Sequence, residues 1–297
     1  MKKNPVVITG ASGFIGSHLV SRMREHGYTL FPLIHKNRNS QPIPGVEEVE
    51  IPLDCRDLIS LFQEIKPAGI IHLATCFRPA HTPEIIPEMI RANVEFGTIL
   101  LESAVKSGVK WFLNTGTFWQ NYEGKCYDPV NLYAATKQAL ESIFAYYRTV
   151  SQIQIVTLCL NDTYGSGDTR KKIFPLWKEL MEHPERKMQM SAGEQIMDVL
   201  HVNDVVDGFL LLTKMLEEEP ERLFGDHRFY LSAKERYSLR ELAGIFEKVS
   251  GKTLNIEWGA RPYREREVMD PRCYGKPLPG WENRITLEEG ISRFLKG

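Results

Sequence analysis

The chain of 297 residues carries 37 basic and 38 acidic side chains, which leaves a formal net charge of −1. This balance excludes the broad positive field that draws proteins to nucleic acid or to an anionic membrane, so any anionic ligand must be held by a local site. The length suffices for one large domain or two modest ones with a substantial apolar core.

The first 160 residues alternate between β-branched apolar runs and segments of helical periodicity. This alternation is typical of a parallel sheet with crossover helices on both faces. In chain order, the strand-like runs are residues 6–9, 29–34, 46–51, 69–73, 110–115 and 154–160. We therefore predict an α/β fold, with a Rossmann-type doubly wound parallel sheet over residues 1–160.

The pattern changes after residue 160. Residues 161–168 are rich in turn formers, and a basic helix is expected near 169–182, a second helix over 203–216 and a last one over 286–295. We expect residues 161–194 and 226–297 to form a smaller mixed α/β substrate-binding lobe at the C-terminal side. Residues 195–225 are expected to return to the first domain.

A glycine-rich turn follows the first predicted strand and leads directly into the first predicted helix. Glycines there permit a tight turn and close approach of the backbone to a pyrophosphate, which the N–H groups of the helix N-terminus can bind. A purely structural turn is the alternative. The turn predicts a dinucleotide-binding site formed by Gly10, Ser12, Gly13, Phe14, Ile15 and Gly16.

The loop after the second predicted strand favours NADP(H) over NAD(H). NAD-preferring enzymes usually carry an acid there for the ribose 2′-hydroxyl, but this chain has none between Glu25 and Glu47. Lys36 and Arg38 instead offer positive charge to a 2′-phosphate, although two solvated surface residues would look the same. NAD(H) stays as the alternative. Asp54, after the third predicted strand, is a candidate acceptor for the adenine amino group.

Tyr133 and Lys137 stand one turn apart at the start of a helix-period segment, so both side chains project from one face. A neighbouring ammonium favours the phenolate, which would move the tyrosine pKa towards the working range. The same spacing at Tyr230 and Lys234 lies in a strand-like run, and an ordinary helix pair also shows it. Because Thr115 ends the fifth predicted strand upstream, we predict Thr115, Tyr133 and Lys137 as the catalytic residues.

These elements, in this order, resemble the extended short-chain dehydrogenase/reductases, and in particular the NAD-dependent epimerase/dehydratase family that acts on nucleotide sugars. The likeness extends over nearly the whole chain: residues 163–168, 198–204 and 280–290 are similar to the family's Tyr-Gly turn, second-lobe signature and C-terminal ending.

The resemblance implies that Thr115 polarises a sugar carbonyl, Tyr133 is the acid/base and Lys137 orients the nicotinamide ribose. It also implies that the cofactor groove is lined by Leu73, Ala74 and Thr75. Asn93 is expected beside that groove, either as a cofactor contact or as a buried structural asparagine.

Residues 116 and 117 depart from the family's dehydratases, which carry an Asp-Glu pair after the threonine. Gly116 and Thr117 cannot transfer protons as carboxylic acids do, which argues against dehydration. Residues 114–120, 133–137 and 271–281 look most like bacterial 4-keto-6-deoxyhexose reductases such as CDP-abequose synthase. That likeness implies reduction by NADPH at C4 of a nucleotide-linked 4-keto-6-deoxyhexose, with Thr117, Phe118, Trp119 and Tyr164 at the sugar, unless these aromatic rings are core residues.

The family's diphosphate contacts are also altered. Met197 stands in place of an arginine, and Asp162 in place of an asparagine. The resemblance therefore implies that Arg264 carries more of the diphosphate, with Lys171 or Lys172 assisting unless both are simply solvated.

Two other functions remain open at this point. A nucleotide-sugar 4-epimerase with tightly bound NAD uses the same catalytic residues, and a non-catalytic nicotinamide sensor can share the fold. The expected helices over 90–106 and 132–147 carry apolar residues on more than one face, which predicts a homodimer unless both helices are buried in one subunit.

Five scattered cysteines form no Cys-x-x-Cys pair, and no histidine cluster has metal-ligand spacing. We therefore expect no metal site and a reducing, cytoplasmic location. No apolar segment approaches the ~18 residues needed to span a bilayer, so we expect neither an export signal nor a membrane anchor.

Overall fold

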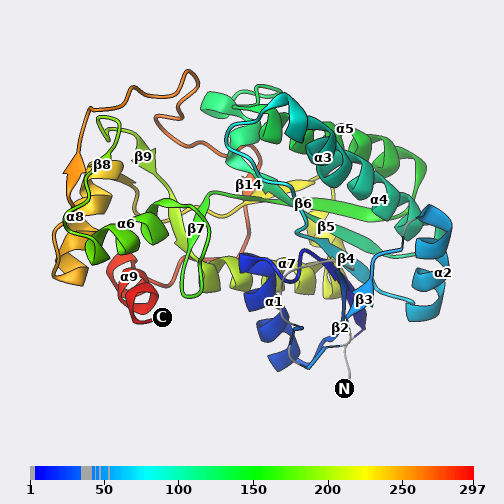
Figure 1. Ribbon diagram of the computed structural model, residues 1–297. Coiled ribbons are helices and arrows are strands. Elements are labelled where there is room, and N and C mark those ends of the chain that lie inside the picture. The colour runs from blue at the N-terminus through cyan, green and yellow to red at the C-terminus, as the bar shows by residue number, and fades with distance from the viewer. Residues whose placement is uncertain (1–3, 35–41, 44, 47, 53) are drawn as a thin grey trace.

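The computed structural model describes residues 4–34, 42, 43, 45, 46, 48–52 and 54–297. One large sheet dominates it, with the strand order β14-β11-β6-β5-β4-β1-β2-β3 and parallel pairing throughout (Figure 1). The predicted doubly wound α/β fold is therefore confirmed. Its strands are β1 (Pro5–Thr9), β2 (Thr29–Ile34), β3 (Val49–Glu50), β4 (Gly69–His72), β5 (Trp111–Thr117), β6 (Gln154–Leu160), β11 (Arg228–Tyr230) and β14 (Lys276–Pro277).

The central strands form where apolar runs are buried on both sides, as parallel sheets require. Val6 and Ile8 of β1 point to one face and Val7 to the other, and all three are fully buried. The strand expected over 46–51 is reduced to β3, Val49–Glu50. It lies at the edge of the sheet as far as the described residues show, paired with β2, and Val49 is half-buried whereas Glu50 is exposed.

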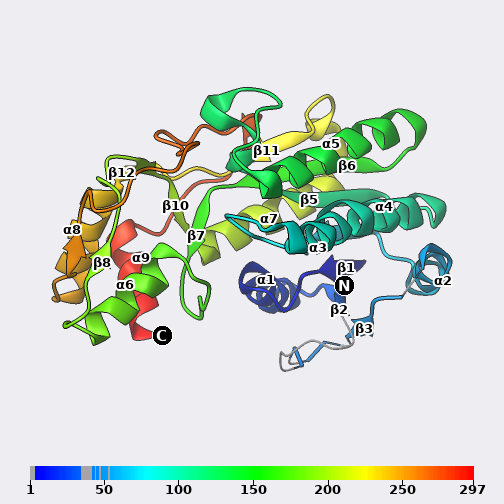
Figure 2. The same cartoon turned by 45° about the horizontal axis from the view of Figure 1, so that its top comes forward.

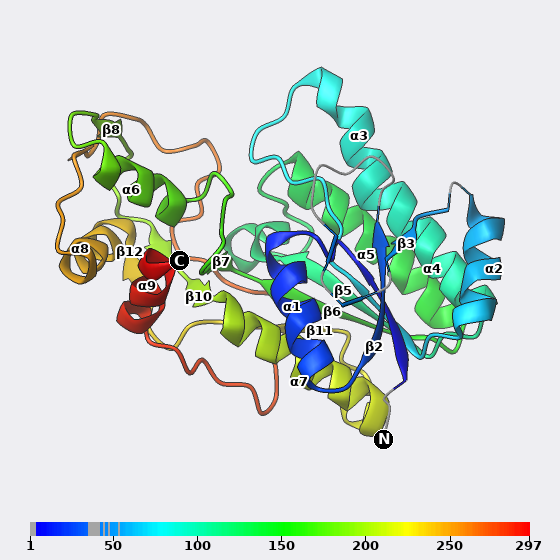
Figure 3. The ribbon, with the colours of Figure 1, turned by 60° about the horizontal axis from the view of Figure 1, so that its bottom comes forward.

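Helices cover both faces of the sheet. On one face, α1 (Phe14–Glu25) and α7 (Val202–Glu218) lie side by side (Figure 3), and Met23 and Phe209 join the core beneath them. On the other face, α2 (Cys55–Ile65), α4 (Phe96–Lys106) and α5 (Leu132–Val150) contribute Phe62, Leu100 and Phe144 (Figure 2). Across the described part of the chain, every helix falls short of the length and apolar character that spanning a membrane would demand.

A smaller group of elements forms a second lobe with its own core. Phe174, Trp177, Phe246 and Phe294 pack together there, and the rings of Phe174 and Phe246 are stacked 5.5 Å apart. Its elements are α6 (Ile173–Glu182), α8 (Leu239–Ser250), α9 (Leu287–Lys296) and the strand pairs β7 (Asp162–Tyr164) with β10 (Val199–His201), β8 (Met188–Gln189) with β13 (Ile256–Glu257) and β9 (Ile196–Met197) with β12 (Tyr237–Ser238).

The chain passes between the lobes more often than its pattern indicates. Strands β11 and β14 come from residues 226–297, yet both lie in the large sheet beside β6. Strands of three and two residues are too short to show a periodicity in the sequence. We propose that the second lobe comprises residues 161–194 and 226–297 without these two strands, together with β9 and β10, and that α7 is the part of residues 195–225 that returns to the first domain.

Two buried aspartates of the 198–204 segment hold the lobes in place. The Asp198 carboxylate accepts hydrogen bonds from Asn161 Nδ2 at 2.9 Å, Ser232 Oγ at 2.5 Å and Ala233 N at 2.9 Å. Burial raises the pKa of Asp198, and the Ala233 amide opposes that shift. This carboxylate therefore joins the segment after β6 to the segment after β11.

Asp204, on the first turn of α7, anchors the segment that precedes α9. Its carboxylate accepts from Asn283 Nδ2 at 2.7 Å, Ile285 N at 3.0 Å and Arg284 N at 3.3 Å, and the residue is only 1% exposed. Because backbone amides left buried without an acceptor are costly, this contact is a main attachment of the C-terminal helix.

We expect Asp204→Ala to lower the free energy of unfolding by ~3 kcal/mol, because it removes the acceptor for several buried donors. Asp207→Ala is the matched control on the same helix: its carboxylate is 38% exposed and pairs with Arg22 at 3.3 Å. The control should cost less than ~1 kcal/mol. Urea denaturation measures both values, and equal losses for the two variants would contradict the anchoring role.

Candidate active site

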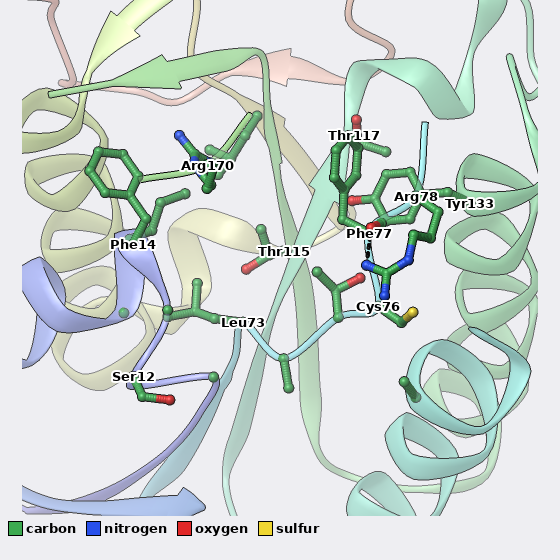
Figure 4. Close-up of a pocket in the computed structure, with 18 of the residues that line it drawn as sticks. Ser12, Phe14, Leu73, Cys76, Phe77, Arg78, Thr115, Thr117, Tyr133 and Arg170 are labelled. Carbon is green, nitrogen blue, oxygen red and sulfur yellow. Dashed lines mark hydrogen bonds between the residues drawn. The ribbon is translucent and has the colours of Figure 1, made fainter. Parts of the chain in front are cut away.

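A cavity of about 1460 Å³ lies at the carboxyl ends of β1, β4 and β5 (Figure 4). The strand order reverses beside β1, and this is the position at which doubly wound sheets bind ligands. The first domain supplies the glycine turn, the loop after β4 and residues 115–119, and the second lobe supplies residues between 160 and 172.

The glycine turn fits the pyrophosphate of a dinucleotide. Gly10 has φ +70°, and a Cβ atom on it would lie 2.6 Å from Ala74 N, so only glycine allows the turn to meet the loop after β4. Gly13, the N-cap of α1, makes no side-chain capping bond. The N–H groups of the first turn of α1 are therefore available to an anion.

Most of the predicted cofactor residues line this cavity. Those that do are Gly10, Ser12, Gly13, Phe14, Ile15, Gly16, Leu73, Ala74, Thr75 and Tyr133. Lys36 and Arg38 lie outside the described residues, so the preference for a 2′-phosphate stays a prediction.

Asp54 has a structural role that its position in the sequence did not indicate. Its Oδ1 caps α2 by accepting from Arg56 N at 2.8 Å and Asp57 N at 2.9 Å, and the residue does not line the cavity. A carboxylate with this bonding is the usual N-cap of a helix.

Thr115 and Tyr133 both line the cavity, from the end of β5 and the first turn of α5 (Figure 4). The Thr115 Oγ1 atom is buried and has no hydrogen-bond partner among the described residues. Because an unpaired buried hydroxyl is costly, this atom is suited to a ligand oxygen. The Tyr133 ring meets Phe77 edge-on, with centroids 5.0 Å apart.

Lys137 lies one turn further along α5, is 3% exposed and does not line the cavity. Burial lowers the pKa of Lys137 to about 8, and the Glu141 carboxylate opposes that shift. Burial raises the pKa of Tyr133 to about 12, and the Thr75 hydroxyl opposes it.

The expectation that Lys137 brings the pKa of Tyr133 towards the working range is therefore wrong. Removal from water penalises the phenolate more than any neighbouring charge favours it. At neutral pH, Tyr133 is consequently a neutral phenol, whereas Lys137 is mainly an ammonium.

Asn93 lies in a π-helical turn, Arg91–Glu95, between α3 (Ile86–Ile90) and α4. Its Oδ1 accepts from Thr75 Oγ1 at 3.0 Å and Cys76 N at 2.7 Å, and its Nδ2 donates to Cys76 O at 3.1 Å and Thr136 Oγ1 at 3.0 Å. The amide thus joins the loop after β4 to the helix that carries Tyr133. It is buried outside the cavity lining, as the structural alternative for this residue requires.

Thr117, Phe118 and Asp162, predicted to contact the substrate, line the cavity together with Trp119 and Lys172. The Thr117 hydroxyl accepts from Trp119 N at 3.4 Å and caps the short turn Phe118–Gln120. Lys172 Nζ donates to Asp162 Oδ1 at 2.9 Å and lies near two aromatic rings of the wall. This lysine is therefore held in the cavity and is not simply solvated.

Tyr164 and Arg264 lie outside the cavity lining. Tyr164 is 3% exposed and packs on Phe174 in the second lobe, with ring centroids 4.4 Å apart. Arg264 lies at the rim, its guanidinium carbon 5.9 Å from the ring of Trp119 and its side chain 63% exposed.

The cavity residues that had not been predicted include Phe77, Arg78 and Arg170. Phe77 could have been predicted from the sequence, because it lies in the loop after the carboxyl end of β4, and ligands of such sheets bind at the carboxyl ends of the strands. Arg170 had no local signal, since its partner across the cavity, Phe14, is distant in sequence.

The model of the NAD dependent epimerase/dehydratase family matches residues 6–224. The sequence is 28% identical to CDP-abequose synthase from Salmonella typhimurium strain LT2, over 99% of this chain and 98% of that protein. It is 25% identical to UDP-glucose 4-epimerase from Mycolicibacterium smegmatis, over 98% of this chain and 97% of that protein. The structure of UDP-glucose 4-epimerase from Brucella ovis in complex with NAD has the same fold, with a TM-score of 0.83, 20% identity and coverage of 99% and 98%. From the match to most of its length, the chain belongs to the NAD-dependent epimerase/dehydratase family.

Proposed function

We propose that the protein catalyses the NADPH-dependent reduction of the C4 keto group of a nucleotide-linked 4-keto-6-deoxyhexose, a step of deoxysugar biosynthesis. The observation that carries this proposal is the unpartnered, buried hydroxyl of Thr115 in a cavity that Tyr133 also lines. The similarity to CDP-abequose synthase along the whole chain supports it.

Reduction of a ketone requires a hydride, a hydrogen bond to the carbonyl oxygen and a proton for the alkoxide. When bound, the nicotinamide supplies the hydride. Thr115 Oγ1 donates the hydrogen bond, and the Tyr133 phenol gives up the proton. An alkoxide is a much stronger base than a phenolate, so a phenol whose pKa is about 12 remains an effective donor.

The packing around Gly116 disfavours dehydration. A Cβ atom at this position would lie 2.8 Å from Thr157 Cγ2 and 3.0 Å from Gln120 Oε1. The carboxylic acid that the family's dehydratases place after the threonine would therefore fit only if the side chains of Thr157 and Gln120 shifted. Thr117, the next residue, is already used as a helix cap.

A nucleotide-sugar 4-epimerase with tightly bound NAD is the second candidate, favoured by the similarity to UDP-glucose 4-epimerases. Epimerisation begins with removal of a proton from a substrate hydroxyl, which requires the phenolate of Tyr133. Burial raises the pKa of Tyr133 in the protein alone, whereas the positive charge of an oxidised nicotinamide beside the phenol would lower it, so cofactor consumption and not this pKa separates the two candidates. A nicotinamide sensor has no use for Thr115 and Tyr133 in one cavity.

The remaining assignments are part of the same proposal. We assign NADP(H) as the preferred cofactor, with NAD(H) as the alternative, from the charge of Lys36 and Arg38. A cytoplasmic location suits the five unpaired cysteines. A homodimer is proposed through α5, on which Tyr146 and Val150 are 61% and 58% exposed.

The proposal is tested by offering NADPH with a panel of nucleotide-linked 4-keto-6-deoxyhexoses and, separately, with UDP-glucose. We expect one NADPH to be oxidised for each ketosugar reduced at C4, measured by nicotinamide absorbance and by NMR of the product. Interconversion of UDP-glucose and its C4 epimer by protein-bound NAD, without net cofactor consumption, would replace the reductase by the epimerase.

We expect Tyr133→Phe to lower kcat for ketosugar reduction by ~10³-fold, because loss of a general acid typically costs 10²–10⁴-fold. The NADPH dissociation constant should change by less than about tenfold, since a single hydroxyl is removed. Tyr230→Phe is the matched control: it repeats the tyrosine-lysine spacing in strand β11, away from the cavity lining, and should keep the parent rate. Parental turnover by Tyr133→Phe would refute the assignment.

The pH dependence of kcat/KM should reflect the titration of Lys137 and not that of Tyr133. Burial lowers the pKa of Lys137 to about 8, so the ammonium prevails below that pH and is lost as the pH rises through it. We therefore expect activity to decline above pH ~8, whereas Lys137→Arg, which stays charged, should lack this alkaline decline in whatever activity it retains. A rate that rises with pH up to ~10 would instead indicate a required phenolate.

A further inference from the structure

Arg170 is held rigidly at the cavity wall by its own lobe. The Asp168 carboxylate accepts from Arg170 Nε at 2.7 Å and from Nη2 at 2.8 Å, and Nη2 also donates to Thr163 O at 2.6 Å. The Asp168 side chain is completely buried, whereas that of Arg170 is 35% exposed. A guanidinium fixed by two partners has already lost most of its rotamer freedom, so a ligand that binds it pays little ordering entropy.

The same guanidinium spans the two lobes. Its carbon lies 4.3 Å from the centre of the Phe14 ring, a cation–π contact (Figure 4). Phe14 is the first residue of α1 and directly follows the N-cap Gly13. Arg170 therefore lies beside the helix N-terminus whose N–H groups are available to an anion.

One edge of the guanidinium is left for a ligand. Within the described residues, Nη1 makes no hydrogen bond, while Nε and Nη2 are both engaged. Arg170 lines the same cavity as Gly13 and Phe14. Two N–H donors on Nη1 and the positive end of α1 are thus available within one cavity, an arrangement that suits a diphosphate.

We propose that Arg170 is a cofactor-binding residue of the second lobe, which holds the pyrophosphate of the nicotinamide dinucleotide against α1 and slows its release. This inference rests on one part of the proposed function, namely that a nicotinamide dinucleotide binds. It does not depend on which sugar is reduced. In a reductase the oxidised cofactor must leave after every turnover, so a contact that joins both lobes over the pyrophosphate lies on the exit path.

The test measures cofactor binding by the full-length protein, separately from turnover. We expect Arg170→Ala to weaken NADPH by ~10- to 100-fold, the usual loss for a charge-assisted hydrogen bond, with most of the change in the dissociation rate. Fluorescence titration gives the affinity and stopped-flow displacement gives the release rate. ADP-ribose, which retains the pyrophosphate but lacks nicotinamide, should weaken by the same factor.

Three variants separate this role from a general loss of charge or structure. Arg170→Lys keeps the positive charge but loses the paired N–H donors of the guanidinium and its planar contact with Phe14. Its affinity for NADPH should therefore lie between those of the parent protein and Arg170→Ala. Phe14→Leu combined with Arg170→Ala should weaken NADPH less than the product of the two single effects, because the residues act as one unit. Arg222→Ala removes an exposed arginine that pairs with Glu219 and should leave NADPH binding unchanged.

Two outcomes would overturn the inference. One is parental affinity and release rate for NADPH in Arg170→Ala. The other is weakened binding of UDP or CDP with unchanged NADPH binding, which would assign Arg170 to the diphosphate of the sugar substrate. If circular dichroism shows that Arg170→Ala does not fold, the same affinity and release-rate measurements are made on Arg170→Lys and Arg170→Gln.

Discussion

The withdrawal of Tyr133 and Lys137 from water determines what this active site can do. Helix α5 is pressed against the sheet by Leu140 and Phe144, and the turns that carry both functional side chains share that buried face. Burial favours the uncharged form of both groups. It therefore raises the pKa of Tyr133 and lowers that of Lys137. In the protein alone, burial therefore favours the neutral phenol of Tyr133 and the neutral amine of Lys137.

The parts of the site that could be predicted are those formed by residues close together in the sequence. The glycine turn between β1 and α1, Thr115 at a strand end and the Tyr133–Lys137 spacing each depend on local structure. The central parallel sheet was predictable for the same reason, because long buried strands leave continuous apolar runs. In contrast, β11 and β14 are too short to show any period.

Other features of the site could not be predicted, because they depend on packing between segments that are distant in the sequence. The pKa of Tyr133 depends on how deeply α5 is buried, which no spacing reveals. Tyr164 belongs to an aromatic core with Phe174, although its motif suggested the sugar pocket. The basic helix expected from about 169 begins at Ile173, since Asp168 binds both the amide and the guanidinium of Arg170 and holds the preceding residues in a turn.

Packing between distant segments also determines which side chains fit at position 116. An acidic side chain after Thr115 would collide with Thr157 of the adjacent strand β6. Thr157 cannot simply move aside, because its Oγ1 donates to Glu141 and accepts from Asn114 Nδ2 at 3.1 Å beneath the site. Glu141 in turn opposes the loss of charge on Lys137. A carboxylic acid at position 116 would therefore disturb the packing of β5, β6 and α5 around Lys137.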